Sequence, residues 1–142
     1  MDLREADLAT VRFYYAERLR YVAHLKSEGL IHALSEVPRE RYLGPGPWQL
    51  YNLQDGSYWL TPDNNPRHLY HNVLVAIDAR RKLNNGLPSA LAYQIEALNL
   101  QPNDHVVHIG CGTGYYTAIM AQLVGRRPHP GVGLCFPLGR VV

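Results

Sequence analysis

The stretch HVVHIGCGTGYYTAIMAQLVG, residues 105–125, holds the most informative pattern in this chain of 142 residues. Residues 105–109 are a short β-branched run that predicts a strand, and residues 110–114 follow at once with three glycines in five positions. Residues 115–125 then predict a helix, with good helix formers in its middle and Gly125 at its C-terminal cap. A strand, a glycine turn and a helix in this order begin a doubly wound α/β domain.

A second helix is predicted immediately before this unit. It begins near Ser89, and Leu91, Ile95 and Leu98 lie on one of its faces. The sequence QPND, residues 101–104, predicts a turn between this helix and the strand that follows. The succession of helix, turn, strand, glycine turn and helix therefore covers about forty consecutive residues near the C-terminal end.

The N-terminal part of the chain also predicts helices. Apolar residues recur at three- to four-residue spacing over residues 8–22, which indicates one helix with an apolar stripe. A shorter helix is expected over residues 30–34, ending before Pro38. Turn-forming residues then fill positions 44–47, and aromatic residues flank Asp55–Gly56, which predicts a hairpin there.

Composition and charge restrict the class of protein. With 46% hydrophobic and 18% charged residues, the chain has the composition of a globular domain. It contains no run near the ~18 apolar residues of a membrane helix, and charges occur throughout the first thirty residues, unlike a secretory signal. A net charge of +2 is too small to indicate a nucleic acid partner. We therefore expect a soluble, cytoplasmic protein that binds neither nucleic acid nor a membrane.

The distribution of charge and of turn-forming residues divides the chain into three expected parts. Asp104 is the last acidic residue, and the final seventeen residues combine three glycines with three prolines. Because each proline removes a backbone donor, residues 126–142 predict an irregular tail. We expect a helical and turn-rich segment at 1–83 and the start of an α/β domain at 84–125. A truncation, or a change of reading frame near Arg126, is one interpretation of the abrupt change.

The turn Gly110-Cys111-Gly112-Thr113-Gly114 favours a bound ligand. Glycine permits positive φ and close approach of a ligand to the backbone, and the helix that follows presents unpaired N–H groups. The dinucleotide fingerprint needs glycine or alanine where this chain has Tyr115, and a P-loop needs a lysine, the last of which is Lys82. The remaining pattern, G-x-G-x-G, is that of S-adenosylmethionine-dependent methyltransferases. A tight turn without a ligand is the structural alternative.

The sequence resembles a known family over roughly residues 30–125. LPSALAYQIEALNLQPNDHVVHIGCGTGYYTAIMAQLVG, residues 87–125, is similar to the opening of the cofactor domain in protein-L-isoaspartate O-methyltransferases, and VPRERYLGP, residues 37–45, resembles the VPRE-type segment of that family. The resemblance implies N-terminal helices followed by a Rossmann-like class I methyltransferase sheet, of which this chain holds the first βα unit. It also implies S-adenosylmethionine as cofactor, and a protein or peptide with an isoaspartyl residue as the partner whose carboxylate is methylated.

The same resemblance assigns candidate site residues. The cofactor would be bound by His108, Gly110, Cys111, Gly112, Thr113 and Gly114. The transferred methyl group would lie near Asn84, Asn85 and Ser89. An ionised carboxylate is itself the nucleophile, so no general base is required and no catalytic residue is assigned.

The chain departs from the family at three places. His108 stands where the family usually has an acidic residue. Asn84, Asn85 and Gly86 occupy the positions of a Thr-Ile-Ser-type segment, so its hydroxyl groups are replaced by amides. Finally, no acid follows Asp104 to accept hydrogen bonds from the ribose hydroxyls.

A non-catalytic function is the alternative to an enzyme. A single βα unit leaves strand edges and one helix face uncovered. The chain would then be a truncated remnant or a partner protein, with weak or no cofactor binding, and a homo-oligomer would be one way to cover its open edges.

Several single residues have two interpretations. His68 and His71, like His105 and His108, form H-x-x-H pairs, but no third ligand accompanies either pair, so surface histidines are favoured over a metal site. Cys111 is either a small residue that fills the turn, which we favour, or a thiol nucleophile at a helix N-terminus. The two cysteines are too few for a disulfide framework.

The aromatic residues before the glycine turn also have two interpretations. They either pack a loop-rich segment, which is favoured, or line a groove for a peptide substrate. The residues concerned are Tyr42, Trp48, Tyr51, Tyr58, Trp59 and Tyr70.

Overall fold

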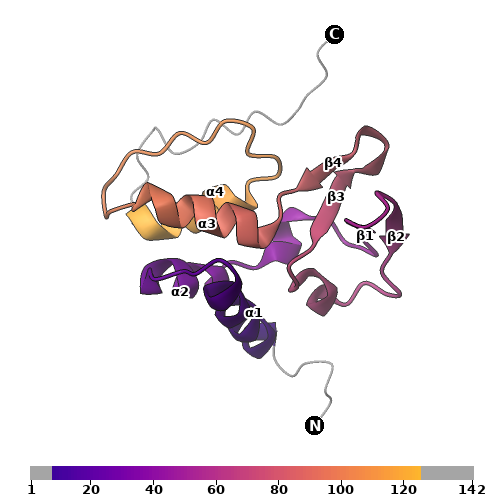
Figure 1. Cartoon of the computed structure of the whole chain (residues 1–142), viewed down its shortest axis with the longest axis horizontal. Helices are drawn as coiled ribbons and strands as arrows, with labels where there is room; N and C mark the ends of the chain where they lie inside the picture. The colour runs from indigo at the N-terminus through magenta and orange to yellow at the C-terminus, as the bar shows by residue number, and fades with distance from the viewer. Residues whose placement is uncertain (1–7, 126–142) are drawn as a thin grey trace.

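The computed structural model describes residues 8–125; the irregular tail expected at 126–142 lies outside the described residues. Figure 1 shows the four helices gathered on one side of the molecule and the strands on the other. The α-helices are α1 (Leu8–Val22), α2 (Glu28–Glu36), α3 (Pro88–Leu98) and α4 (Tyr115–Val124). The strands are β1 (Gln49–Tyr51), β2 (Tyr58–Leu60), β3 (Leu74–Asp78) and β4 (Leu83–Asn85).

The two N-terminal helices confirm the prediction from apolar spacing. α2 is longer than expected because Ser27 caps it: the Ser27 hydroxyl accepts a hydrogen bond from the Leu30 N–H at 3.2 Å. Its C-terminal cap, Val37, precedes Pro38, as the restriction on residues before proline requires. α3 begins with Pro88 in its first turn, one residue before the predicted start.

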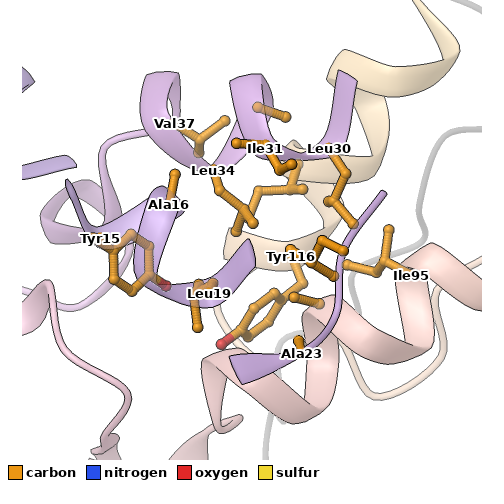
Figure 2. Packing of buried hydrophobic residues seen from close by; sticks show 14 of the residues in the cluster. Tyr15, Ala16, Leu19, Ala23, Leu30, Ile31, Leu34, Val37, Ile95 and Tyr116 are labelled. Carbon is orange, nitrogen blue, oxygen red and sulfur yellow. The ribbon is translucent and has the colours of Figure 1, made fainter. Parts of the chain in front are cut away.

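All four helices contribute to one apolar core. Tyr15 and Leu19 of α1 and Leu30 of α2 are at most 1% exposed, and they pack with residues of α3 and α4 (Figure 2). Complete burial of a leucine side chain stabilises the folded state by about 1.5–3 kcal/mol. The N-terminal helices are therefore held against the helix that follows the glycine turn.

The sheet is antiparallel throughout, with the strand order β2-β1-β3-β4. The hairpin predicted at Asp55–Gly56 is confirmed: it joins β1 to β2, Gly56 has φ +74°, and Asp55 accepts hydrogen bonds from Ser57. β3 and β4 were not expected from the sequence. They pair around the exposed run Arg80–Lys82, with a register shift between Ala76 and Asp78.

The strand predicted at residues 105–109 is wrong for the described structure. This segment forms no strand, and the side chains of Val107 and Ile109 are 73% and 90% exposed. A strand needs a neighbour to pair its backbone N–H and C=O groups, and no segment within residues 8–125 pairs with this one. The mixed α/β class and the helix after the glycine turn are confirmed.

Among residues 8–125, no helix is both long enough and apolar enough to cross a membrane.

Candidate functional site

The glycine turn has the backbone that its composition predicts. Gly110, Gly112 and Gly114 all have positive φ, at +72°, +58° and +92°. The Gly114 N–H donates to the carbonyl of Cys111 at 3.0 Å, which closes the turn. Gly114 is also the N-cap residue of α4, and no side chain of residues 8–125 makes a capping hydrogen bond to this helix. A helix N-terminus of this kind is a favourable place for a polar or anionic ligand.

Gly112 lies close to the sheet. A Cβ atom at this position would lie 3.1 Å from Cδ1 of Ile77 on β3, whereas a Cβ atom at Gly110 would meet nothing within 4 Å. The turn is thus packed on one side by β3 and open on the other. A ligand can approach the backbone at Gly110, since no atom of residues 8–125 outside its chain neighbours lies within 4 Å of a Cβ position there. These features fit the methionine part of S-adenosylmethionine.

His108 is linked to α4. Its Nδ1 atom lies 2.8 Å from the hydroxyl of Thr117, and burial lowers the pKa of its imidazole below the usual range. The ring is therefore neutral at pH 7. It lies at an apolar cavity of about 210 Å³ between α3 and α4, together with Leu91, Val106 and Met120.

The other two residues of the turn differ from each other. Thr113 is exposed. Cys111 is 6% exposed, as expected of a small residue that fills the turn.

Residues 84–86, which we call the acceptor segment, end β4 and lead into α3. The Tyr58 hydroxyl donates to Oδ1 of Asn84 at 2.8 Å, and Asn84 is partly exposed. Asn85 is only 3% exposed, and its Oδ1 accepts two hydrogen bonds from Arg39. Asn84 is thus the more accessible of the two asparagines.

The acceptor segment is also tied to α4, and α3 begins directly after it. The Tyr116 hydroxyl of α4 donates a hydrogen bond to the carbonyl oxygen of Gly86. Ser89 lies in the first turn of α3, partly exposed, and its N–H donates to Oδ1 of Asn72 at 2.9 Å. Asn84, Asn85 and Ser89 therefore lie on one stretch of chain, but the first two differ strongly in exposure.

Sequence reasoning missed Arg39. It lies in the 3₁₀ helix Arg39–Tyr42, is 0% exposed, and its guanidinium lies 5.7 Å from the ring centroid of Tyr115. Arginine is rarely buried without a partner, so composition alone indicates a surface residue. The only signal in the sequence was its place in the segment VPRERYLGP, residues 37–45.

Of the histidines expected on the surface, His71 and His105 are exposed, and His68 is partly exposed with a carboxylate partner. His68 Nε2 lies 2.8 Å from the Asp63 carboxylate. The pKa of His71 is lowered, mainly by burial and then by the charge of Arg18. Within residues 8–125, no three histidine, cysteine, aspartate or glutamate residues are grouped as metal ligands would be.

The aromatic residues before the turn are partly packed and partly exposed. Trp48 is 5% exposed in the small core of the sheet, and Tyr70 is fully buried in the helical core. Tyr51 and Tyr58 stack edge to face at 5.1 Å, while Trp59 is 50% exposed. Packing therefore explains Trp48 and Tyr70, which are buried.

The glycine turn in front of α4 has the G-x-G-x-G pattern expected of a class I methyltransferase, and the similarity to known proteins points to the same class. The family model described as "Protein-L-isoaspartate(D-aspartate) O-methyltransferase (PCMT)" matches residues 15–132. The chain belongs to the protein-L-isoaspartate (D-aspartate) O-methyltransferase family.

Individual relatives are similar to a large part of this chain. It is 30% identical over 107 residues to the protein-L-isoaspartate O-methyltransferase of Ignicoccus hospitalis, covering 75% of this chain and 41% of the relative. It is 30% identical over 128 residues to the protein of the same name from Dictyoglomus thermophilum, covering 87% and 48%. The Trichlorobacter lovleyi protein of this name is 39% identical over 69 residues. The chain thus spans less than half the length of these relatives.

Proposed function

We propose that this chain binds S-adenosylmethionine at the glycine turn and takes part in methyl transfer to the carboxylate of isoaspartyl residues. The observation that carries the proposal is the turn 110–114, in which three glycines of positive φ lead into an uncapped helix, in a member of this family. The cofactor-binding part would extend over residues 84–125. The partner would be a protein or peptide with an isoaspartyl residue, and the reaction would take place in the cytoplasm.

Two elements of the chain support cofactor binding. The N-terminus of α4, with its positive end of the helix dipole and no side-chain cap within residues 8–125, favours a carboxylate such as that of the methionine part of the cofactor. The side chain of His108 is held by Thr117 and is neutral, so it offers a hydrogen bond at this edge of the site without a fixed charge. Cys111 and Thr113 contribute through their backbone in this arrangement.

When bound, S-adenosylmethionine supplies a methyl group on a positively charged sulfur; the methyl forms a bond to a carboxylate oxygen while the carbon–sulfur electrons stay on the sulfur of S-adenosylhomocysteine. The residues of this chain only have to hold the acceptor in line with that methyl group. The Asn84 carboxamide accepts from Tyr58 through its oxygen, and its Nδ2 donates to the Lys82 carbonyl at 3.5 Å, so one of its two N–H groups is left to donate to an acceptor carboxylate. Ser89 lies close by in the chain, at the start of α3.

Calorimetric titration with S-adenosylhomocysteine tests the cofactor site. We expect saturable one-to-one binding by the full chain, weakened about tenfold or more in Gly112→Asp, since this substitution adds a side chain at 3.1 Å from Ile77 and a negative charge in the turn. Gln122→Glu adds the same charge on an exposed position of α4 and serves as the matched control. If the folded chain does not bind S-adenosylhomocysteine, the proposed function is wrong and the non-catalytic alternative applies.

A further inference from the structure

Arg39 is a buried residue that contacts both the acceptor segment and the helix that follows the glycine turn. It comes from the segment between α2 and β1 and is completely buried. Its Nε and Nη2 atoms donate to Oδ1 of Asn85 at 3.2 and 3.1 Å. The same side chain donates through Nη1 to the carbonyl of Leu69 at 2.8 Å and through Nη2 to the carbonyl of Val73 at 3.1 Å.

The other contact of Arg39 is with the start of α4. Its guanidinium carbon lies 5.7 Å from the centroid of the Tyr115 ring. Tyr115 directly follows Gly114, is fully buried, and its hydroxyl lies 3.4 Å from that of Tyr15. The ring therefore has little freedom to move independently of the helix that it begins.

These contacts need an arginine. The planar guanidinium offers five donors in a fixed fork, and it can face an aromatic ring while it donates to several carbonyl groups. A lysine has three donors on one atom and cannot reproduce both contacts. None of the hydrogen-bond acceptors of Arg39 among residues 8–125 is a carboxylate, so Arg39 does not form a structural ion pair there.

We propose that Arg39 is a positioning residue that holds the acceptor segment in register with the glycine turn, through Asn85 on one side and Tyr115 on the other. Asn85 is directly bonded to Asn84, so anchoring Asn85 also restricts the position of Asn84, the more exposed of the two asparagines. The inference rests on the proposed function, because it concerns the alignment of methyl donor and acceptor. In this role, Arg39 contacts neither the methyl donor nor the methyl acceptor.

The first test separates binding from alignment. Arg39→Lys is compared with wild type in methyl transfer to an isoaspartyl peptide, with kcat expressed per S-adenosylhomocysteine-binding site. We expect kcat to fall about tenfold or more while both KM values stay within about threefold, because misalignment affects the transition state more than either ground state. Arg41→Lys, on the same 3₁₀ helix but exposed, is the matched control and retains the wild-type kcat.

The second test needs no turnover. In the wild-type chain, saturating S-adenosylhomocysteine should shift the side-chain amide NMR resonances of Asn85, which is 3% exposed, through Tyr115 and Arg39. In Arg39→Lys, that shift should fall to less than about half while the ligand still binds. This readout does not depend on the amount of folded variant or on the identity of the methyl acceptor.

The outcomes are distinguishable. If S-adenosylhomocysteine binds but leaves the Asn85 resonances of wild type unchanged, the role of Arg39 is wrong and the cofactor site stands. If Arg39→Lys keeps the wild-type kcat per binding site, the proposed role of Arg39 is also wrong, and the cofactor site again stands. If the wild-type chain binds no S-adenosylhomocysteine, the proposed function is wrong and this inference falls with it.

Discussion

The hydroxyl of Tyr58 donates a hydrogen bond of 2.8 Å to Oδ1 of Asn84 and so joins β2 to β4, the two outer strands of the sheet. The bond has two consequences. It links the two outer strands of the small sheet, and it occupies the Asn84 oxygen, while Nδ2 donates one N–H to the Lys82 carbonyl at 3.5 Å and keeps a second N–H for an acceptor.

Tyr58→Phe should therefore weaken both stability and acceptor binding. Loss of the hydrogen bond is expected to reduce the free energy of unfolding by about 0.5–1.5 kcal/mol and to raise the KM for an isoaspartyl peptide. Urea unfolding and steady-state kinetics measure the two effects. Tyr51→Phe, on the paired strand β1, is the control for loss of a tyrosine hydroxyl from the same hairpin. An unchanged free energy of unfolding in Tyr58→Phe would show that the bond contributes nothing.

Alanine substitutions in the glycine turn separate backbone strain from packing. Gly110→Ala and Gly112→Ala both place a side chain at positive φ, which costs about 1–2 kcal/mol each. Only Gly112→Ala also brings a Cβ atom to 3.1 Å from Ile77. We expect Gly112→Ala to lower the free energy of unfolding more than Gly110→Ala, as measured by urea unfolding. Equal losses would mean that Ile77 moves aside without cost.

The bond from Tyr116 to the acceptor segment should contribute measurably to stability. Tyr116→Phe keeps the buried ring but leaves the Gly86 carbonyl without its donor, which is expected to cost about 1–3 kcal/mol. Thermal unfolding, with the enthalpy determined by calorimetry, measures the loss. A variant as stable as wild type would indicate that another donor replaces the tyrosine hydroxyl.

Stability should depend on pH through two histidines. Burial lowers the folded-state pKa of His108 and of His71, so the unfolded chain binds more protons as the pH falls through about 6.5. The free energy of unfolding should consequently decrease between pH 7.5 and pH 5.5, a window above the titration of the carboxylates. His108→Asn should make this dependence shallower. Parallel pH profiles for wild type and His108→Asn would contradict the assignment to His108.

Local patterns in the sequence were sufficient for the elements that depend on local interactions. The apolar stripe of α1, the proline and apolar spacing of α3, and the glycines before α4 each act within a few residues. The Asp55–Gly56 hairpin is equally local, since its turn residues and the strands next to them determine it. These predictions are confirmed for that reason.

Features that depend on distant partners were not accessible in this way. β3 and β4 gain their pairing from each other and from β1, and nothing in their short sequences requires it. Conversely, residues 105–109 have strand propensity but no partner within the described part of the chain. Arg39 is the clearest case among the site residues, because its five donors are satisfied by carbonyl groups 30 to 46 positions away.

Methyl transfer to a matched pair of peptides tests the central claim most directly. The full chain is incubated with S-adenosylmethionine labelled in its methyl group and with two peptides that differ only in containing isoaspartate or aspartate. We predict a base-labile methyl ester on the isoaspartyl peptide alone, and its loss in Gly112→Asp. No labelled ester on either peptide, from a chain that binds S-adenosylhomocysteine, would contradict the proposed reaction.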